Sequence, residues 1–244
     1  MCERLQGLPF ERIAAVDGRT VEGPELRAAI RPPGYEHLNR YERAVLLSHR
    51  AAWARFLETG ERLACVLEDD VVLSPSFGDF VRDESWIPAD STLVKIETYD
   101  QPVVLSRHAI QFNGRSLTVL KSRHLGAAAY IISRAGAASY VEKSIRPDRT
   151  IDYMIFGELA VKENSPVYQL CPALCIQAKR LPGGVTHPEL DTASQFYAPG
   201  PGKPLMHRLK KEVPRPFIQL ARFLWSIASG RRLSERRCRR VEFA

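Results

Sequence analysis

Hydrophobic residues between positions 41 and 58 follow the periodicity of an amphipathic helix. They recur every three or four positions and would form one buried face: Leu46, His49, Trp53 and Phe56. Asn39 and Glu42 precede this stretch at the spacing of a capping box, and Gly60 follows it as a stop signal. The pattern therefore predicts a helix from residue 41 to residue 58.

Short apolar runs predict a series of strands. Leu63–Leu67 follows the helix, and its continuous apolar character is typical of a strand that is buried on both faces. Further strands are expected at 11–16, 91–97, 102–106, 116–120, 126–133, 165–170 and 173–177. Helices are expected near residue 74, over 133–143 and from about Thr150. This alternation of strands and helices predicts an α/β layered domain.

Three adjacent carboxylates, Glu68, Asp69 and Asp70, follow the run at 63–67 directly. Ligands of open α/β sheets gather at the carboxyl ends of strands. Residues two apart share one side of an extended chain, so Glu68 and Asp70 are expected to point together while Asp69 points away. Oxygen ligands at this spacing suit Mg²⁺ or Mn²⁺ held jointly with substrate phosphates. A solvated acidic turn is the alternative that the residues leave open.

The positive charge of the chain is concentrated toward its C-terminal end. Residues 203–244 carry 12 Lys and Arg against 3 Asp and Glu, whereas residues 1–202 carry 23 against 25. Apolar residues at 217–228 fall on one side of a helix, and the Arg-rich stretch 231–240 follows. This predicts a basic amphipathic tail on an anionic membrane surface, with a helix packed on the body and a disordered basic end as the alternative. Nucleic-acid binding is not expected, because no aromatic-basic platform accompanies the charge.

The composition is that of a folded domain, with 45% hydrophobic and 26% charged residues. No apolar stretch approaches the roughly 18 residues that a membrane span needs, and the first residues lack a signal-peptide core. We therefore expect a cytoplasmic protein, with a peripheral position on the inner face of the cytoplasmic membrane. The five cysteines form no CxxC pair, which predicts free thiols.

Six segments, in the same order and at similar spacing, resemble glycosyltransferase family 25, which includes bacterial lipooligosaccharide galactosyltransferases. The segments are "FERIAAVDG" (10–18), "LLSHRAAWARFL" (46–57), "ACVLEDDVVLSPSF" (64–77), "GAAAYIISRAGA" (126–137), "TIDYMIFG" (150–157) and "VYQLCPALCIQ" (167–177). The resemblance implies a GT-A-like layered domain with a mixed, mostly parallel sheet. It also implies transfer of a hexose, most simply galactose, from a UDP-sugar to a lipopolysaccharide or lipooligosaccharide core acceptor, with inversion.

The same resemblance implies roles for the acidic residues. Glu68 and Asp70 take the place of the metal ligands, and Asp69 that of a contact to the nucleotide sugar. A divalent cation, Mn²⁺ or Mg²⁺, would stabilise the charge that grows on the UDP leaving group. Inverting transfer also needs a base, for which Asp152 and Glu97 are rival candidates. Asp152 equally fits a first-turn carboxylate that complements the helix dipole.

Four further positions are candidates for contacts to the donor: Asp17, Gly18, His49 and Gly126. Turn chemistry alone would explain Asp17 and Gly18, and a satisfied core histidine would explain His49. Gly126 would allow the backbone to approach a sugar closely.

Family members begin with a further strand before the region that matches "ERLQGLPFERIAAVDG", and we expect this domain to lack it. The expected organisation is a catalytic domain at 1–178, a Pro/Gly-rich loop or linker at 179–204, and a basic amphipathic tail at 205–244. The main alternative function is a non-catalytic, truncated sugar- or nucleotide-binding remnant tethered to the membrane. A metal-dependent phosphohydrolase ranks last, because further His and Asp ligands for a two-metal site are not close by in the sequence.

Overall fold

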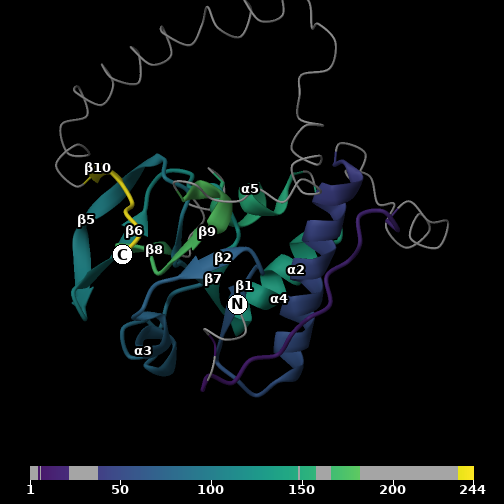
Figure 1. Ribbon diagram of the computed structural model, residues 1–244, viewed down its shortest axis with the longest axis horizontal. Helices are drawn as coiled ribbons and strands as arrows, with labels where there is room; N and C mark the ends of the chain where they lie inside the picture. The colour runs from purple at the N-terminus through teal and green to yellow at the C-terminus, as the bar shows by residue number, and fades with distance from the viewer. Residues whose placement is uncertain (1–4, 6, 22–37, 148, 158–165, 182–235) are drawn as a thin grey trace, which may run out of the picture.

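The computed structural model describes residues 5, 7–21, 38–147, 149–157, 166–181 and 236–244. Within these residues the chain forms a large and a small β-sheet with helices packed beside them (Figure 1). The large sheet has the order β1-β7-β3-β8-β6-β5-β10. Its strands are β1 (Leu63–Leu67), β7 (Ala129–Ser133), β3 (Leu93–Lys95), β8 (Val167–Cys171), β6 (Arg115–Leu120), β5 (Pro102–Phe112) and β10 (Arg236–Arg240).

Antiparallel pairing dominates the large sheet. Among the described strands, β3 and β8 form its one parallel pair. The mixed α/β architecture agrees with the sequence prediction, but the expectation of a mostly parallel sheet is wrong. One reason is local: Asn113 and Gly114, with φ angles of 43° and 75°, form a two-residue turn that makes β5 and β6 an antiparallel hairpin. The other is that β7 runs antiparallel to both of its neighbours, β1 and β3.

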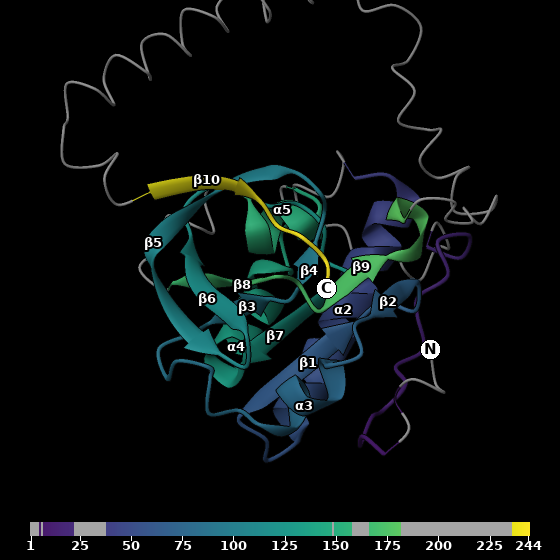
Figure 2. The ribbon, with the colours of Figure 1, turned by 60° about the vertical axis from the view of Figure 1, so that its left-hand side comes forward.

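The small sheet is built from chain segments that leave the large sheet. Its order is β2-β9-β4, with β2 (Val71–Leu73), β9 (Cys175–Gln177) and β4 (Glu97–Thr98). The chain passes from β1 to β2, from β3 to β4 and from β8 to β9, and Figure 2 shows β2 and β9 side by side near the end of β1. Residues at these three passages therefore converge on the boundary between the two sheets.

Four α-helices accompany the sheets in the described part of the chain: α2 (Arg40–Glu58), α3 (Phe77–Arg82), α4 (Arg134–Lys143) and α5 (Ile151–Phe156). The predicted helix at 41–58 is confirmed as α2, and Asn39 and Glu42 form the expected capping box. Helix α2 packs against α4 and α5, as Figure 1 shows for α4. None of the described helices has the length and apolar character needed to cross a membrane.

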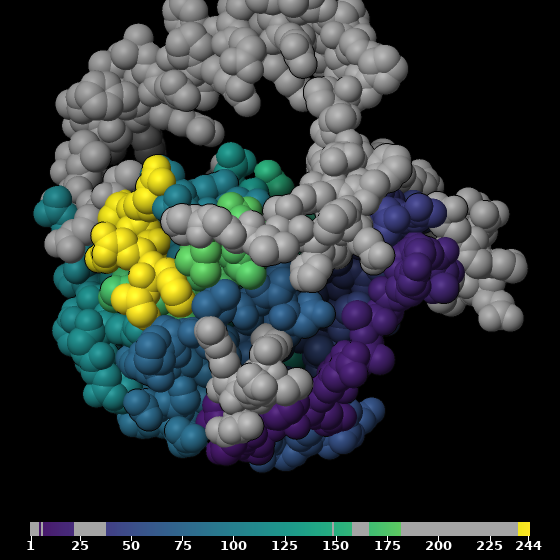
Figure 3. All heavy atoms as spheres, viewed as in Figure 1, coloured from purple at the N-terminus to yellow at the C-terminus, as the bar shows by residue number. Residues whose placement is uncertain are grey.

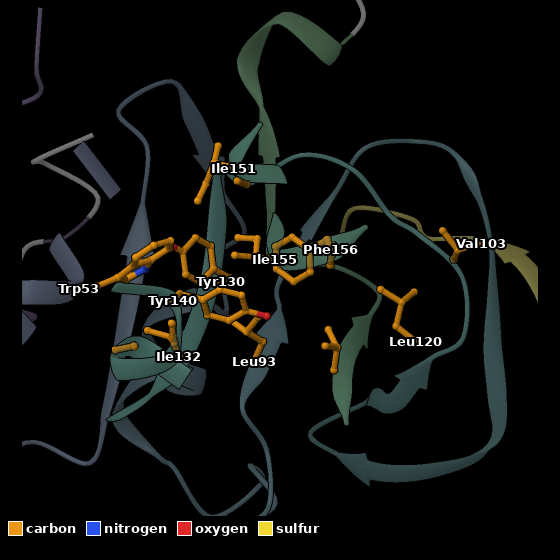
Figure 4. Close-up of a cluster of buried hydrophobic side chains, with 14 of the residues drawn as sticks. Trp53, Leu93, Val103, Leu120, Tyr130, Ile132, Tyr140, Ile151, Ile155 and Phe156 are labelled. Atoms are coloured by element: carbon orange, nitrogen blue, oxygen red, sulfur yellow. The ribbon is translucent and has the colours of Figure 1, made fainter. Parts of the chain in front are cut away.

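A hydrophobic core lies on each face of the large sheet. One core joins the sheet to α2, α4 and α5 (Figure 4), and the other joins it to α3. Adjacent residues of β3 show the division, since Leu93 belongs to the first core and Val94 to the second. Strand β1 is only half-buried, so the expectation that Leu63–Leu67 is buried on both faces is wrong. The reason is its position at the edge of the sheet.

The last nine residues pack onto the domain. Strand β10 pairs antiparallel with β5, Val241 is 1% exposed, and Phe243 forms a parallel bridge with Ala173. Figures 2 and 3 show this segment in yellow lying across the body of the protein. For residues 236–244 the expected helical or disordered tail is therefore wrong, because the long strand β5 offers a second edge that β10 pairs with. The expected helix at 217–228 and the linker residues 182–204 lie outside the described residues.

Residues 7–21, which precede α2 in the sequence, contain no strand. The expected strand at 11–16 is therefore wrong, although the turn that follows it is present, with the Thr20 amide 2.9 Å from the Asp17 carbonyl oxygen. The Val16 amide donates to Ser48 Oγ at 2.9 Å, and Glu11 pairs with Arg55. These side-chain contacts hold the segment along α2 (Figure 1) without a neighbouring strand.

Candidate active site

The acidic cluster lies on the passage from β1 to β2. Gln177, the last residue of β9, places its Nε2 3.3 Å from Glu68 Oε2 and 3.1 Å from Asp70 Oδ2. The two carboxylates therefore face one another across one amide, while Asp69 between them is exposed. The sequence predicted that Glu68 and Asp70 point together, but Asp69 and Asp70 lie in a turn and not in an extended chain. Lys179 adds a weaker contact, with Nζ 3.9 Å from Asp70 Oδ2.

Two backbone contacts hold the cluster in place. The Glu68 amide donates to the Ala128 carbonyl at 2.8 Å, and the Ala178 amide donates to the Asp70 carbonyl at 2.8 Å. The first contact continues the β1–β7 ladder by one residue beyond Leu67. The second joins the end of β9 to the start of β2. Both carboxylates thus sit on paired backbone, not on a free loop.

The environment shifts the pKa values of the two carboxyl groups in opposite directions. Burial, together with the charge of Glu68, raises the pKa of Asp70. Burial acts in the same direction on Glu68, but the hydrogen bond from His49 and nearby positive charges outweigh it, and the pKa of Glu68 is lowered. His49 Nε2 lies 3.4 Å from Glu68 Oε1. Glu68 is therefore the carboxylate that the protein itself keeps charged.

A buried ion pair lies next to the cluster. Lys95 and Glu97 have fully buried side chains, with Lys95 Nζ 2.9 Å from Glu97 Oε2. The Ala128 amide donates to the same Glu97 oxygen at 3.0 Å, and Lys95 also donates to the Gly126 carbonyl. Burial raises the pKa of Glu97 and lowers that of Lys95, and the pairing opposes both shifts.

Gly126 covers the second oxygen of Glu97. Its φ is +90°, and a Cβ at this position would lie 2.8 Å from Glu97 Oε1 and 2.9 Å from Tyr99 Cδ2. Glu97 Oε1 itself is buried and finds no hydrogen-bond partner among the described residues. A glycine is thus required here by both conformation and space.

The remaining predicted residues lie farther from the acidic pair. Asp152 is half-buried in the first turn of α5, where its Oδ1 accepts from the Tyr153 amide at 2.9 Å and from Thr150 Oγ1. Asp17 accepts hydrogen bonds from the backbone and side chain of Arg19. Gly18 is buried against Tyr41, whose Cδ1 would lie 2.6 Å from an added Cβ. The structure therefore brings together Glu68, Asp70, His49, Glu97 and Gly126, and places Asp17, Gly18 and Asp152 outside their direct contacts.

Sequence reasoning missed the residues that connect these groups. Lys95 lies inside an apolar run, and the one signal for it was its spacing of two residues from Glu97, which puts both side chains on the same side of an extended chain. Lys179 comes shortly after β9 without any pattern that marks it. Tyr130 is a core residue, but its hydroxyl also contacts His49 at 2.8 Å.

The donor set at the acidic pair is compatible with a hard divalent cation. Mg²⁺ and Mn²⁺ prefer carboxylate oxygens and retain open positions for water or substrate phosphates. Glu68 and Asp70 supply two such groups within reach of one amide. In the part of the chain that the structure describes, no group of three or more His, Cys, Asp or Glu side chains is arranged to hold a metal. Among the described residues, Glu68 and Asp70 thus offer two carboxylates, and substrate and water are suitable further ligands.

Comparisons with known proteins agree with the resemblance. Residues 2–155 match the family model described as "Glycosyltransferase family 25 (LPS biosynthesis protein)". The chain is 32% identical over 185 residues to the lacto-N-neotetraose biosynthesis glycosyltransferase LgtB of Neisseria gonorrhoeae, over 70% of this chain and 66% of that protein. The LgtE glycosyltransferase of the same organism gives 32% identity over 70% of this chain and 65% of its own length.

A third relative comes from a different genus. The lipooligosaccharide biosynthesis protein lex-1 of Haemophilus influenzae is 36% identical over 152 residues, which are 57% of this chain and 50% of that protein. The chain thus spans slightly less than two thirds of the length of LgtB and LgtE and half of the length of lex-1.

Proposed function

The chain belongs to glycosyltransferase family 25, and from this premise we propose that it transfers a hexose from a UDP-sugar to a lipopolysaccharide or lipooligosaccharide core acceptor. The relatives are described as glycosyltransferases or biosynthesis proteins of lacto-N-neotetraose and lipooligosaccharide. Galactose is the proposed sugar, and inversion at the anomeric carbon is the proposed stereochemistry. The layered sheets are proposed to be a GT-A fold.

One observation carries the proposal: Glu68 and Asp70 face each other at the boundary between the two sheets, with Gln177 contacting both. Glu68 and Asp70 would hold Mn²⁺ or Mg²⁺, which supplies positive charge to the diphosphate as the glycosidic bond breaks. Asp69 is exposed beside them and is proposed to contact the nucleotide sugar. Lys179, near Asp70, adds a cation where the anionic donor would bind.

The proposed base is Asp152, not Glu97. Glu97 is fully buried, and its Oε2 is occupied by Lys95 and the Ala128 amide, so it does not reach an acceptor hydroxyl in this state. Asp152 is partly exposed. Burial lowers the pKa of Lys95, and the negative charge of Glu97 opposes this shift. The charge of Asp152 opposes it to a smaller extent, so Asp152 lies within electrostatic reach of the buried ion pair.

The donor is proposed to lie along the line of Asp17, Gly18, His49 and Gly126. His49 is connected to the acidic pair by its contact with Glu68. Gly126 is connected to the buried ion pair because it lies against Glu97. The turn at Asp17 is connected to His49 by one hydrogen bond. The amide of Val16 donates to the hydroxyl of Ser48, the residue before His49.

The proposal also includes a membrane surface. The acceptor of such a reaction is lipid-linked, and residues 203–244 carry 12 Lys and Arg against 3 Asp and Glu. We place the protein on the inner face of the cytoplasmic membrane. Because β10 belongs to the fold, the test replaces Arg231 and Arg232 by Gln and leaves residues 236–244 in place. Equal flotation of the wild type and this variant with anionic liposomes would contradict the proposed membrane contact.

The main experiment measures UDP release from UDP-galactose, with Mn²⁺ and a lipooligosaccharide acceptor. The test variant is Glu68→Gln with Asp70→Asn, and the matched control is Glu58→Gln, which alters an exposed carboxylate on α2. We expect acceptor-dependent release by the wild type and the control and its loss in the double variant. A folded wild type that releases no UDP from UDP-sugars would favour the non-catalytic remnant instead.

A further inference from the structure

A chain of hydrogen bonds leads from the hydrophobic core to the acidic pair. Trp53 Nε1 donates to Tyr130 Oη at 2.8 Å, and Tyr130 Oη lies 2.8 Å from His49 Nδ1. His49 Nε2 lies 3.4 Å from Glu68 Oε1. Trp53 and Tyr130 are 0% exposed and His49 is 5% exposed, whereas the Glu68 side chain is 30% exposed. Figure 4 shows the inner end of this chain, with Trp53 and Tyr130 adjacent in the core.

The donors and acceptors along this series of hydrogen bonds assign the tautomer of His49. The indole N–H can only donate, so Tyr130 Oη accepts from Trp53 and has one proton of its own to give. His49 Nδ1 is the acceptor at hydrogen-bond distance. The neutral ring then carries its proton on Nε2, where it faces Glu68 Oε1.

Packing also restricts the orientation of the His49 ring. Its centroid lies 5.8 Å from that of Tyr130 in a stacked arrangement, and 6.1 Å from that of Trp53. A rotation about the side-chain bonds would break the stack and leave the buried hydroxyl proton of Tyr130 without its acceptor. The position of Nε2 is therefore set by the core.

The two oxygens of Glu68 have different partners. His49 takes Oε1, and Gln177 takes Oε2 while also contacting Asp70. We propose that Tyr130 and His49 are positioning residues, which hold the Glu68 carboxylate so that Oε2 faces Asp70 and a divalent cation between them. This inference rests on the proposed function only for the use of that cation.

The test uses Mn²⁺ as the probe and measures its binding to the full chain in the presence of UDP, by the electron paramagnetic resonance signal of free Mn²⁺. Tyr130→Phe removes the hydroxyl and keeps the ring. We expect it to weaken Mn²⁺ binding about tenfold, the lower end of the effect of removing an outer-shell partner. Tyr140→Phe is the matched control, because Tyr140 lies in the same core and packs on Trp53. It should leave Mn²⁺ affinity unchanged.

Measuring the effect of Tyr130→Phe in a protein that also carries Glu68→Gln separates a positioning role from a general loss of structure. If Tyr130 acts through Glu68, then Tyr130→Phe has no further effect on Mn²⁺ affinity in a protein that already carries Glu68→Gln. An equal loss in both backgrounds, or wild-type affinity in folded Tyr130→Phe, would overturn the inference. So would a wild type that binds no Mn²⁺ with UDP. Far-UV circular dichroism establishes that each variant is folded.

The tautomer gives a test that needs no variant. Nitrogen-15 NMR of histidine-labelled wild type should show His49 with its proton on Nε2, and a proton on Nδ1 would overturn the assignment. UDP release, measured on the same preparations, keeps the two claims apart. Turnover by the wild type together with unchanged Mn²⁺ affinity in Tyr130→Phe would refute the positioning role and leave the proposed function intact.

Discussion

His124 should make the stability of the protein depend on pH in a predictable way. The side chain is 0% exposed, with Nδ1 2.7 Å from Gln169 Oε1 and Nε2 accepting from the Tyr99 amide at 3.2 Å. The neutral ring satisfies both contacts with its proton on Nδ1. A second proton on Nε2 would face an N–H donor. Burial, reinforced by the charge of Lys95, lowers the pKa of His124 from 6.5 to about 3.

The sign and size of the effect follow from this pKa. The unfolded chain takes up a proton at this site near pH 6.5, whereas the folded protein does so only near pH 3. The contribution to stability is therefore fully present above pH 6.5 and is lost progressively as the pH falls from 6.5 toward 3. Each pH unit in this window corresponds to about 1.4 kcal/mol, so acidification from pH 6.5 to 5 removes about 2 kcal/mol.

The assay compares wild type with His124→Asn, which keeps an N–H donor toward Gln169 but does not titrate. Urea unfolding at several pH values between 7.5 and 5 gives the free energy of unfolding of each protein. Asp70 and Glu97, whose pKa values are raised mainly by burial, act with the opposite sign in both proteins, so the difference in slope isolates His124. Two parallel curves would refute the reasoning.

Three further changes test other parts of the structure. Gly126→Ala places a Cβ 2.8 Å from Glu97 Oε1 at a φ of +90°, and we expect it to lower the free energy of unfolding by about 1–3 kcal/mol in urea, whereas unchanged stability would contradict the close approach. Deletion of residues 236–244 removes β10 and the buried Val241, and should lower the melting temperature by about 5 °C or more in differential scanning calorimetry. An unaltered melting curve would show that the segment is dispensable. Lys95→Met leaves the charge of Glu97 buried without its partner and should lower the free energy of unfolding by roughly 3–5 kcal/mol. Adding Glu97→Gln should restore part of this loss. A Lys95→Met variant as stable as the wild type would show that Glu97 needs no partner.

Features that depend on neighbouring residues were predictable from the sequence. Helix α2 agrees with the predicted range to within one residue, because its capping box and its buried stripe are both local patterns. Strand β1 agrees at both ends for the same reason. Glu68 and Asp70 lie together as predicted, but a turn at Asp69 and Asp70 and the shared contact with Gln177 bring them together, not strand alternation.

Features that depend on distant partners were not predictable. The run at 91–97 reads as one strand, yet it is divided between two sheets at Ile96, whose carbonyl accepts from the amides of Leu174 and Cys175. Nothing within the run indicates those partners. Strand β10 is a similar case, because its pairing is determined by the free edge of β5, more than 120 residues earlier, and not by its own Arg-rich sequence.

The position of Ala128 explains why the candidate site is more coherent than any of its motifs. Its carbonyl accepts from the Glu68 amide, and its amide donates to Glu97 Oε2. One peptide segment before β7 therefore ties the acidic passage of β1 to the buried pair at the end of β3. Because β7 lies antiparallel between those two strands, their carboxyl ends meet where β7 begins. The strand itself was predicted, but its antiparallel direction was not, and that direction brings the predicted carboxylates together.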